Sequence, residues 1–120
     1  MILIIGGTGQ GKLDYVLRQT GYTQEQVAHT PEEAQRLPVF YGLERWPELD
    51  EAQLLAANPD VILICAEVGC GVVPIDPAQR KWREAVGRLC CRLARRAARV
   101  ERIFCGLPMV LKGEGKWNWS

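Results

Sequence analysis

The residues best suited to chemistry form a glycine-rich segment near the start of the sequence, running from Gly6 to Lys12. The segment fits the pattern G-x-x-x-x-G-K, in which glycines let backbone N–H groups converge on phosphate oxygens and the lysine reaches the terminal phosphates. An apolar run, Met1 to Ile5, precedes it, and a candidate helix, Lys12 to Gln19, follows it. This strand, loop and helix context is the one that a phosphate-binding loop requires. We therefore predict that ATP or GTP is bound, with Lys12 as a catalytic group, by Gly6, Gly7, Thr8, Gly9, Gln10, Gly11, Lys12 and Leu13.

The position after the lysine departs from the usual motif. Leu13 stands where Ser or Thr is normal, so the hydroxyl that would bind Mg²⁺ is absent and another group or water must hold the metal. We expect this departure to weaken catalysis more than nucleotide binding.

Two other interpretations of the glycines stay open. Gly7, Gly9 and Gly11 also form the G-x-G-x-G pattern of some NADP-binding proteins, but position 12 is lysine and no clear second strand ends in an acidic residue about twenty residues on. The other alternative is a tight turn without a ligand, although so many glycines cost stability unless something approaches closely.

A second group of candidates follows the most apolar run of the chain, Val61 to Cys65. Glu67 comes just after this predicted strand, where a carboxylate could bind Mg²⁺ through water or orient an acceptor hydroxyl; the alternative is a carboxylate that caps a helix or turn. Arg80 and Arg83 lie three residues apart on a predicted helix and could both meet phosphates.

These residues belong to a larger pattern. The run Glu67-Val68-Gly69-Cys70-Gly71-Val72-Val73-Pro74, followed by Arg80, Trp82-Arg83-Glu84 and Gly87-Arg88, resembles the E-V-G-x-G-I-V-P and R-x-F-R-D-x-x-G-R signature of the adenosylcobinamide kinase and adenosylcobinamide-phosphate guanylyltransferase family. The ending Cys105-Gly106-Leu107-Pro108 to Lys112 is similar to that family's A-G-L-P-x-x-L-K. The resemblance implies a RecA-like P-loop fold, Mg²⁺ with a nucleoside triphosphate, and a corrinoid acceptor whose aminopropanol hydroxyl is phosphorylated. It also implies a second step in which GMP passes through a guanylylated histidine.

The chain departs from this family at several positions. The only histidine, His29, has no R-P-x-x-W after it, Asp60 precedes its strand and so lies at the wrong end of a sheet to bind magnesium, and Cys90-Cys91 replace an Asn-Gln pair. We expect the guanylyltransferase activity to be absent. Two hypotheses remain for the rest: a reduced kinase, or a catalytically inactive nucleotide- or corrinoid-binding protein that regulates or joins a partner.

The elements that must position these residues alternate between strands and helices. Thr30, Pro31 and Glu33 predict a capped helix ending near Leu37, and Asp50 predicts another. Asp76 predicts a long helix, whose buried stripe consists of Trp82, Val86, Leu89, Cys90, Leu93 and Ala97, and Gly87 within it indicates a close neighbour. With a last strand at Val100 to Cys105, the pattern predicts a reduced α/β P-loop domain over 1–112, a mainly parallel sheet with helices on both faces, and a tail over 113–120.

Composition limits the classes of function. Fifteen Lys and Arg against fourteen Asp and Glu leave a net charge of +1, which predicts no general attraction to nucleic acid or to an acidic membrane. The early apolar run is too short for a signal core or a membrane span, so we expect a cytoplasmic protein. Five cysteines without a C-x-x-C pair argue against a disulfide framework or zinc ribbon, and assembly into a homo-oligomer stays open.

Overall fold

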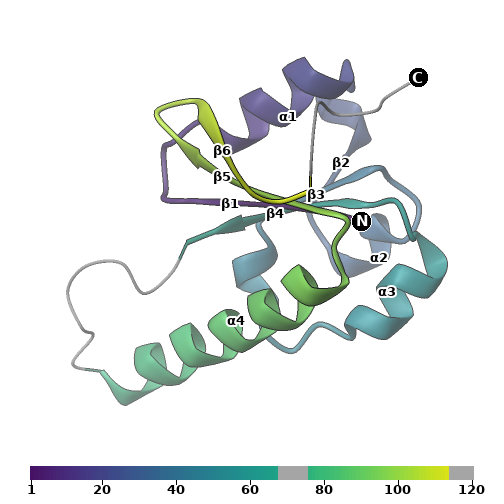
Figure 1. The fold of residues 1–120 in the computed structure, drawn as a ribbon. Coiled ribbons are helices and arrows are strands. Elements are labelled where there is room, and N and C mark those ends of the chain that lie inside the picture. The colour runs from purple at the N-terminus through teal and green to yellow at the C-terminus, as the bar shows by residue number, and fades with distance from the viewer. Residues whose placement is uncertain (68–75, 114–120) are drawn as a thin grey trace.

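A six-stranded sheet forms the centre of the computed structural model, which describes residues 1–67 and 76–113. The strand order is β2-β3-β4-β1-β5-β6, and every neighbouring pair is parallel except β5 and β6 (Figure 1). This confirms the predicted mainly parallel α/β architecture. The strands are β1 Ile2–Gly6, β2 Val27–Ala28, β3 Val39–Tyr41, β4 Ile62–Ala66, β5 Arg99–Phe104 and β6 Leu107–Lys112.

Helices cover both faces of the sheet, as expected. The α-helices are α1 Lys12–Thr20, α2 Pro31–Ala34, α3 Glu51–Ala57 and α4 Pro77–Arg96, and two 3-10 turns are η1 Gln24–Gln26 and η2 Leu43–Arg45. On one face, Tyr15 and Val16 of α1 join the buried cluster around Ile4. On the other, Leu89 of α4 lies in a second cluster, to which Leu54 of α3 also belongs. Figure 1 shows α1 above the sheet and the other α-helices below it.

The two most apolar runs of the sequence form the central strands. β1 and β4 lie side by side in register, with Ile5 opposite Cys65 and Gly6 opposite Ala66. Strands that are covered on both faces need continuous apolar residues, which is why these two could be predicted to within one residue. Both end at the same edge of the sheet, so the residues that follow them are neighbours.

Helix α4 begins as predicted but is not buried along its whole length. The Asp76 side chain accepts a hydrogen bond from the Ala78 N–H, and Pro77 occupies the first turn. The expected stripe is confirmed at its C-terminal end, where Val86, Leu89 and Leu93 are buried. Trp82 was placed in that stripe wrongly, since it is 37% exposed. The N-terminal half of α4 runs away from the sheet (Figure 1). There Trp82 Nε1 donates a hydrogen bond to the Glu44 backbone oxygen in η2.

Gly87 has no close neighbour among the described residues, whereas the sequence indicated a neighbouring strand or a subunit there. A Cβ placed on Gly87 would have no described atom within 4 Å beyond the helix itself. Gly87 borders a shallow hollow along α4 together with Glu84, Arg88 and Cys91. The glycine therefore serves no packing contact among the described residues.

Three strands were not predicted. β2 and β3 have two and three residues, too few to show an apolar period, and both lie between residues 21 and 47. β6 runs antiparallel to β5 at the edge of the sheet, beyond Val100 to Cys105, where the chain's last strand was expected. Arg99 is the first residue of β5 and is buried.

Some predictions fall outside the described residues. The part of the signature from Val68 to Pro74, including Cys70, and the tail beyond Gly113 are not described. Within the described part, no helix is both long enough and apolar enough to cross a membrane.

Candidate functional site

The glycine-rich loop connects β1 to α1 at the carboxyl edge of the sheet. A Cβ on Gly6 would lie 2.6 Å from the Ile103 backbone oxygen, so only glycine fits there. Gly11 precedes the first residue of α1 with a φ of 84°, in the left-handed region that glycine adopts without strain. The sequence therefore places glycine where the turn into the helix requires it.

Lys12 begins α1 and lies over the loop. Its side chain is nearly covered, with the residue 7% exposed, and its Nζ donates a hydrogen bond to the Gly7 backbone oxygen at 2.8 Å. Desolvation lowers the pKa of this ammonium group from its usual value, while the negative charges of Glu44 and Glu67 oppose the change. The site thus holds a nearly buried ammonium group beside two carboxylates.

A turn between β5 and β6 fixes the other side of the loop. The Gln10 side-chain Oε1 accepts a hydrogen bond from the Cys105 N–H at 2.7 Å, and the Gln10 backbone oxygen accepts one from the Gly106 N–H at 2.9 Å. A Cβ on Gly11 would lie 3.6 Å from the Gly106 Cα. The glycine-proline end of the sequence signature is therefore a neighbour of the phosphate loop, which sequence spacing alone did not indicate.

Leu13 does not face the loop as a hydroxyl residue would. It is half-buried and packs against the apolar cluster beneath α1, which includes Tyr15 and Val16. The side chain at this position therefore belongs to the core.

Glu67 lies beside the loop, as its place after β4 predicted. Its backbone N–H donates to the Gly6 oxygen at 2.7 Å, which continues the β1–β4 pairing by one residue. Its carboxylate forms an ion pair with Arg102 of β5, with 3.0 Å between Oε2 and Nε. Glu67 is thus close to Lys12, but a cation from the chain already occupies one of its oxygens.

Glu44 is a site residue that the sequence did not reveal. It lies in η2, directly after β3, and its Oε1 accepts a hydrogen bond from the Ala66 N–H at 2.9 Å. Its backbone oxygen accepts one from Trp82 Nε1 at 2.9 Å. A cavity of about 100 Å³ at the loop is lined by Thr8, Gly9, Lys12, Tyr41, Glu44, Ile64 and Ala66. The only sequence signal was Gly42, whose φ of 86° lets the chain turn back over the sheet edge.

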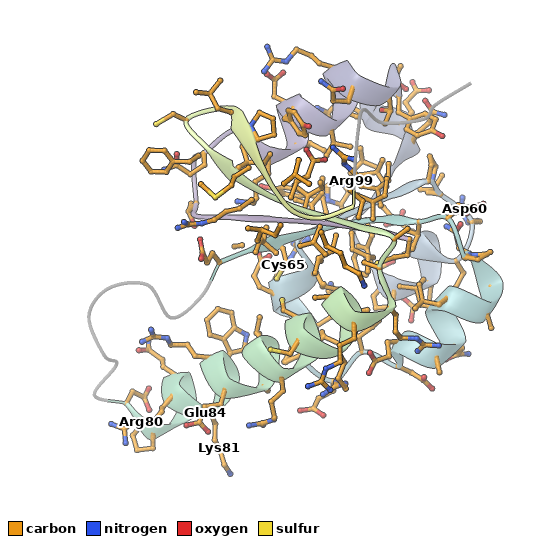
Figure 2. All side chains as sticks on the ribbon, in the orientation of Figure 1. Asp60, Cys65, Arg80, Lys81, Glu84 and Arg99 are labelled. Carbon is orange, nitrogen blue, oxygen red and sulfur yellow. The ribbon has the colours of Figure 1, made fainter. Side chains whose placement is uncertain are left out.

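Neither of the two predicted phosphate-binding arginines lines the cavity at Lys12. Arg80 is exposed near the outer end of α4 (Figure 2), and Arg83 is half-buried one turn further along. Asp60 precedes β4, so it lies at the N-terminal end of the parallel strands, away from the loop at their carboxyl end, as expected (Figure 2).

His29 follows β2 at the carboxyl edge of the sheet. It is exposed, its backbone N–H donates to Glu33 Oε1 at 3.1 Å, and its ring meets that of Tyr41 edge-on, with 6.2 Å between the centroids. Tyr41 in turn lines the cavity at the loop. The acidic residue that a dinucleotide site places after this strand is absent, because His29 stands there.

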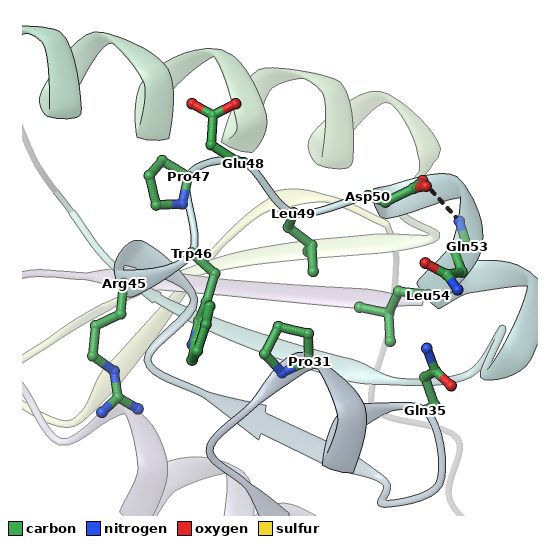
Figure 3. Close-up of a pocket in the computed structure, with 10 residues that line it drawn as sticks. All are labelled: Pro31, Gln35, Arg45, Trp46, Pro47, Glu48, Leu49, Asp50, Gln53 and Leu54. Atoms are coloured by element: carbon green, nitrogen blue, oxygen red, sulfur yellow. Dashed lines mark hydrogen bonds between the residues drawn. The ribbon is translucent and has the colours of Figure 1, made fainter.

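A second cavity lies away from the loop, between α2, η2 and α3 (Figure 3). It has a volume of about 400 Å³ and mainly apolar walls that include Pro31, Trp46, Leu49 and Leu54. No sequence pattern pointed to it. Within the described residues, no three His, Cys, Asp or Glu side chains are grouped as a metal site.

The fold and this geometry define an α/β protein with a glycine-rich loop and a buried lysine at the carboxyl edge of a mainly parallel sheet. The family model for cobinamide kinase / cobinamide phosphate guanyltransferase matches residues 44–111, more than half of the sequence. The chain belongs to this family.

A curated relative gives a second comparison. The bifunctional adenosylcobalamin biosynthesis protein CobP of Pseudomonas aeruginosa is 43% identical over 54 residues, which cover 45% of this chain and 31% of that protein. The chain therefore matches less than a third of that relative's length. The family match begins at Glu44, so the loop from Gly6 to Lys12 rests on its own motif and geometry.

Proposed function

We propose that this chain binds a nucleoside triphosphate, ATP or GTP, at the loop from Gly6 to Lys12 and phosphorylates an alcohol group of a corrinoid. The observation that carries the proposal is the buried Lys12 ammonium group, held over the loop at the end of β1. Membership of the cobinamide kinase / cobinamide phosphate guanyltransferase family supports the kinase reaction and the corrinoid acceptor. A cytoplasmic location stays part of this proposal.

In the proposed step the acceptor's hydroxyl oxygen forms a bond to the γ-phosphorus. The bond from that phosphorus to the oxygen bridging the β- and γ-phosphates breaks, the nucleoside diphosphate leaves, and the hydroxyl proton passes to a carboxylate or to water. Lys12 would exchange its hydrogen bond to the Gly7 oxygen for the terminal phosphates. Loop N–H groups and the start of α1 would stabilise the same charge.

The donors near the loop suit Mg²⁺ rather than a softer metal. The carboxylates of Glu44 and Glu67 and the hydroxyl of Thr8 are oxygen donors, and Mg²⁺ is commonly held by one or two carboxylates together with phosphate oxygens and water. When bound with the nucleotide, Mg²⁺ would neutralise charge on the β- and γ-phosphates.

One observation favours a second candidate, nucleotide or corrinoid binding without turnover. Leu13 packs against the apolar cluster beneath α1 and offers no hydroxyl, and Glu67, the expected metal ligand, is paired with Arg102. A binding protein of this kind would regulate or join a partner. Both candidate functions, the kinase and the binding protein, lack the guanylyltransferase step, because no R-P-x-x-W follows His29.

The test is transfer of the γ-phosphoryl group from ATP and from GTP to adenosylcobinamide, compared between the wild type and Lys12→Ala. Transfer by the wild type that is lost in the variant supports the kinase. Nucleotide binding without transfer eliminates the kinase and leaves the binding protein. A covalent GMP adduct found by mass spectrometry after incubation with GTP would contradict the loss of the guanylyltransferase step.

A further inference from the structure

Glu44 faces the same cavity as Lys12, and no sequence pattern or family motif described above gives it a role. The two residues line a cavity of about 100 Å³ at the glycine-rich loop, together with Thr8 and Gly9. Glu44 comes from η2 and Lys12 from α1, so the fold brings together two charges that are far apart in the sequence. The negative charge of Glu44 would repel a bound phosphate, so its place beside Lys12 needs a physical explanation.

Atoms of two other elements hold Glu44: one contacts its carboxylate and one its backbone. The Ala66 N–H at the end of β4 donates to Oε1, and Trp82 of α4 donates from its indole nitrogen to the Glu44 backbone oxygen. Only one of its two carboxylate oxygens accepts a hydrogen bond from a described residue. No described residue donates a hydrogen bond to the second oxygen, which can therefore bind a metal ion.

The other candidates for a metal ligand are less suitable. The position that normally supplies a hydroxyl is Leu13, which packs in the core. Glu67 forms an ion pair with Arg102, and Asp60 precedes β4 and lies at the far edge of the sheet. Among the described acidic residues, Glu44 alone both lines the loop cavity and has no ion pair.

We propose that Glu44 is the acidic metal-binding residue of this site, holding the Mg²⁺ of a bound nucleoside triphosphate directly or through water. The inference rests on the proposed nucleotide binding and adds the residue that replaces the missing hydroxyl. A carboxylate beside the γ-phosphate is unfavourable by itself, but a divalent cation between them makes both contacts attractive. The hydrogen bond from Ala66 then orients this ligand, as outer contacts orient ligands in other metal sites.

The test compares nucleotide affinity with and without Mg²⁺ in Glu44→Gln. An amide oxygen still accepts the Ala66 hydrogen bond, so this variant removes the charge and retains the anchoring contact. We expect Mg²⁺ to tighten ATP or GTP binding by the wild type, and the variant to lose about tenfold or more of that gain. Without Mg²⁺, the variant should bind nucleotide at least as tightly as the wild type, because a repulsive charge has gone.

A second readout is Mn²⁺ bound in the presence of nucleotide, followed by electron paramagnetic resonance, where Glu44→Gln should weaken Mn²⁺ binding. Glu48→Gln is the matched control, since Glu48 is an exposed carboxylate that lines the other cavity. An unchanged Mg²⁺ effect in Glu44→Gln would overturn the inference, as would a loss that appears only in Glu67→Gln. Equal weakening with and without Mg²⁺ would show a purely structural role. If the wild type binds no nucleotide, the proposed function fails and this inference with it.

Discussion

The side chain of Gln10 accepts a hydrogen bond from the backbone N–H of Cys105 at 2.7 Å, across 95 residues of sequence. This bond ties the glycine-rich loop to the turn between β5 and β6, where Cys105 adopts a left-handed φ of 52°. It explains why the glycine-rich loop and the C-terminal end of the sequence signature lie together: the turn between β5 and β6 supports the loop that follows β1.

Two substitutions at Gln10 should distinguish the effect of its hydrogen bond on stability from the effect of charge at the loop on nucleotide binding. Gln10→Ala removes the acceptor and should lower the free energy of unfolding by about 0.5–1.5 kcal/mol, measured by urea denaturation. Gln10→Glu retains an acceptor for the Cys105 N–H and should retain most of that stability. It should nevertheless weaken nucleotide binding, because it adds a negative charge to the loop. Equal stability of Gln10→Ala and the wild type would show that the bond does not hold the loop.

A buried acidic residue in β5 should matter for stability. Glu101 is 0% exposed; its Oε1 accepts from the Tyr15 hydroxyl at 2.6 Å and its Oε2 pairs with Arg99 Nε at 3.0 Å. Glu101→Ala should cost about 3–5 kcal/mol, because Arg99 would keep its charge in the interior without this partner. Tyr15→Phe should cost less, about 1.5–3 kcal/mol, since it removes one hydrogen bond to a charged group. Chemical denaturation would measure both, and a cost under about 1 kcal/mol for Glu101→Ala would contradict the account.

Two glycine substitutions should change the free energy of unfolding in opposite directions. Gly87 lies inside α4 with open space at its Cβ position, so Gly87→Ala should raise the free energy of unfolding by about 0.5–1 kcal/mol. Gly11 has a φ of 84°, so Gly11→Ala should lower it by about 1 kcal/mol or more. Thermal unfolding of both variants provides the comparison. Destabilisation by Gly87→Ala would mean that this helix position has a contact outside the described residues.

The pKa of Lys12 gives a pH-dependent prediction. Desolvation lowers this pKa in the folded protein below its unfolded value near 10.5. The unfolded chain therefore binds the proton more tightly, which destabilises the folded state below the lowered pKa. This penalty should disappear as the pH rises through the interval between the lowered pKa and 10.5.

The reference for this prediction is Lys12→Met, which carries no charge at any pH. The wild type should be less stable than Lys12→Met at pH 7, and the difference should shrink toward pH 10, measured by urea denaturation at each pH. Nucleotide affinity of the wild type should fall over the same alkaline interval, because the ammonium group loses its charge. A stability difference that does not change with pH would rule out a lowered pKa for Lys12.

The sequence predicted the parts of the fold that depend on short patterns. The continuous apolar runs around Ile4 and Leu63 indicated strands, and both residues are buried in the structure. The side chains of Thr30, Asp50 and Asp76 accept backbone hydrogen bonds at the helix starts, as expected. Strands β2 and β3 could not be predicted, because two or three residues carry no period. Tertiary contacts set the pairing of β2 with β3 and of β3 with β4.

The candidate site was predicted only in part for a similar reason. Lys12 and its glycines form a contiguous motif, so their role could be proposed from spacing. Glu44 enters the site through a turn after a three-residue strand, and only the sheet order brings it opposite Lys12. Trp82 fitted a helical stripe, but the sequence does not show where α4 runs past the sheet.

The most direct test of the central claim is calorimetric titration of the wild type and Lys12→Ala with ATP and GTP, with adenosine and guanosine as phosphate-free controls. We predict saturable binding of at least one triphosphate by the wild type and much weaker binding of the nucleosides. Lys12→Ala should lose roughly 10- to 100-fold in affinity, because a charge-assisted contact contributes about 1.5–3 kcal/mol. Absence of triphosphate binding by the folded wild type, or equal affinity in a folded Lys12→Ala variant, would contradict the assignment of this loop.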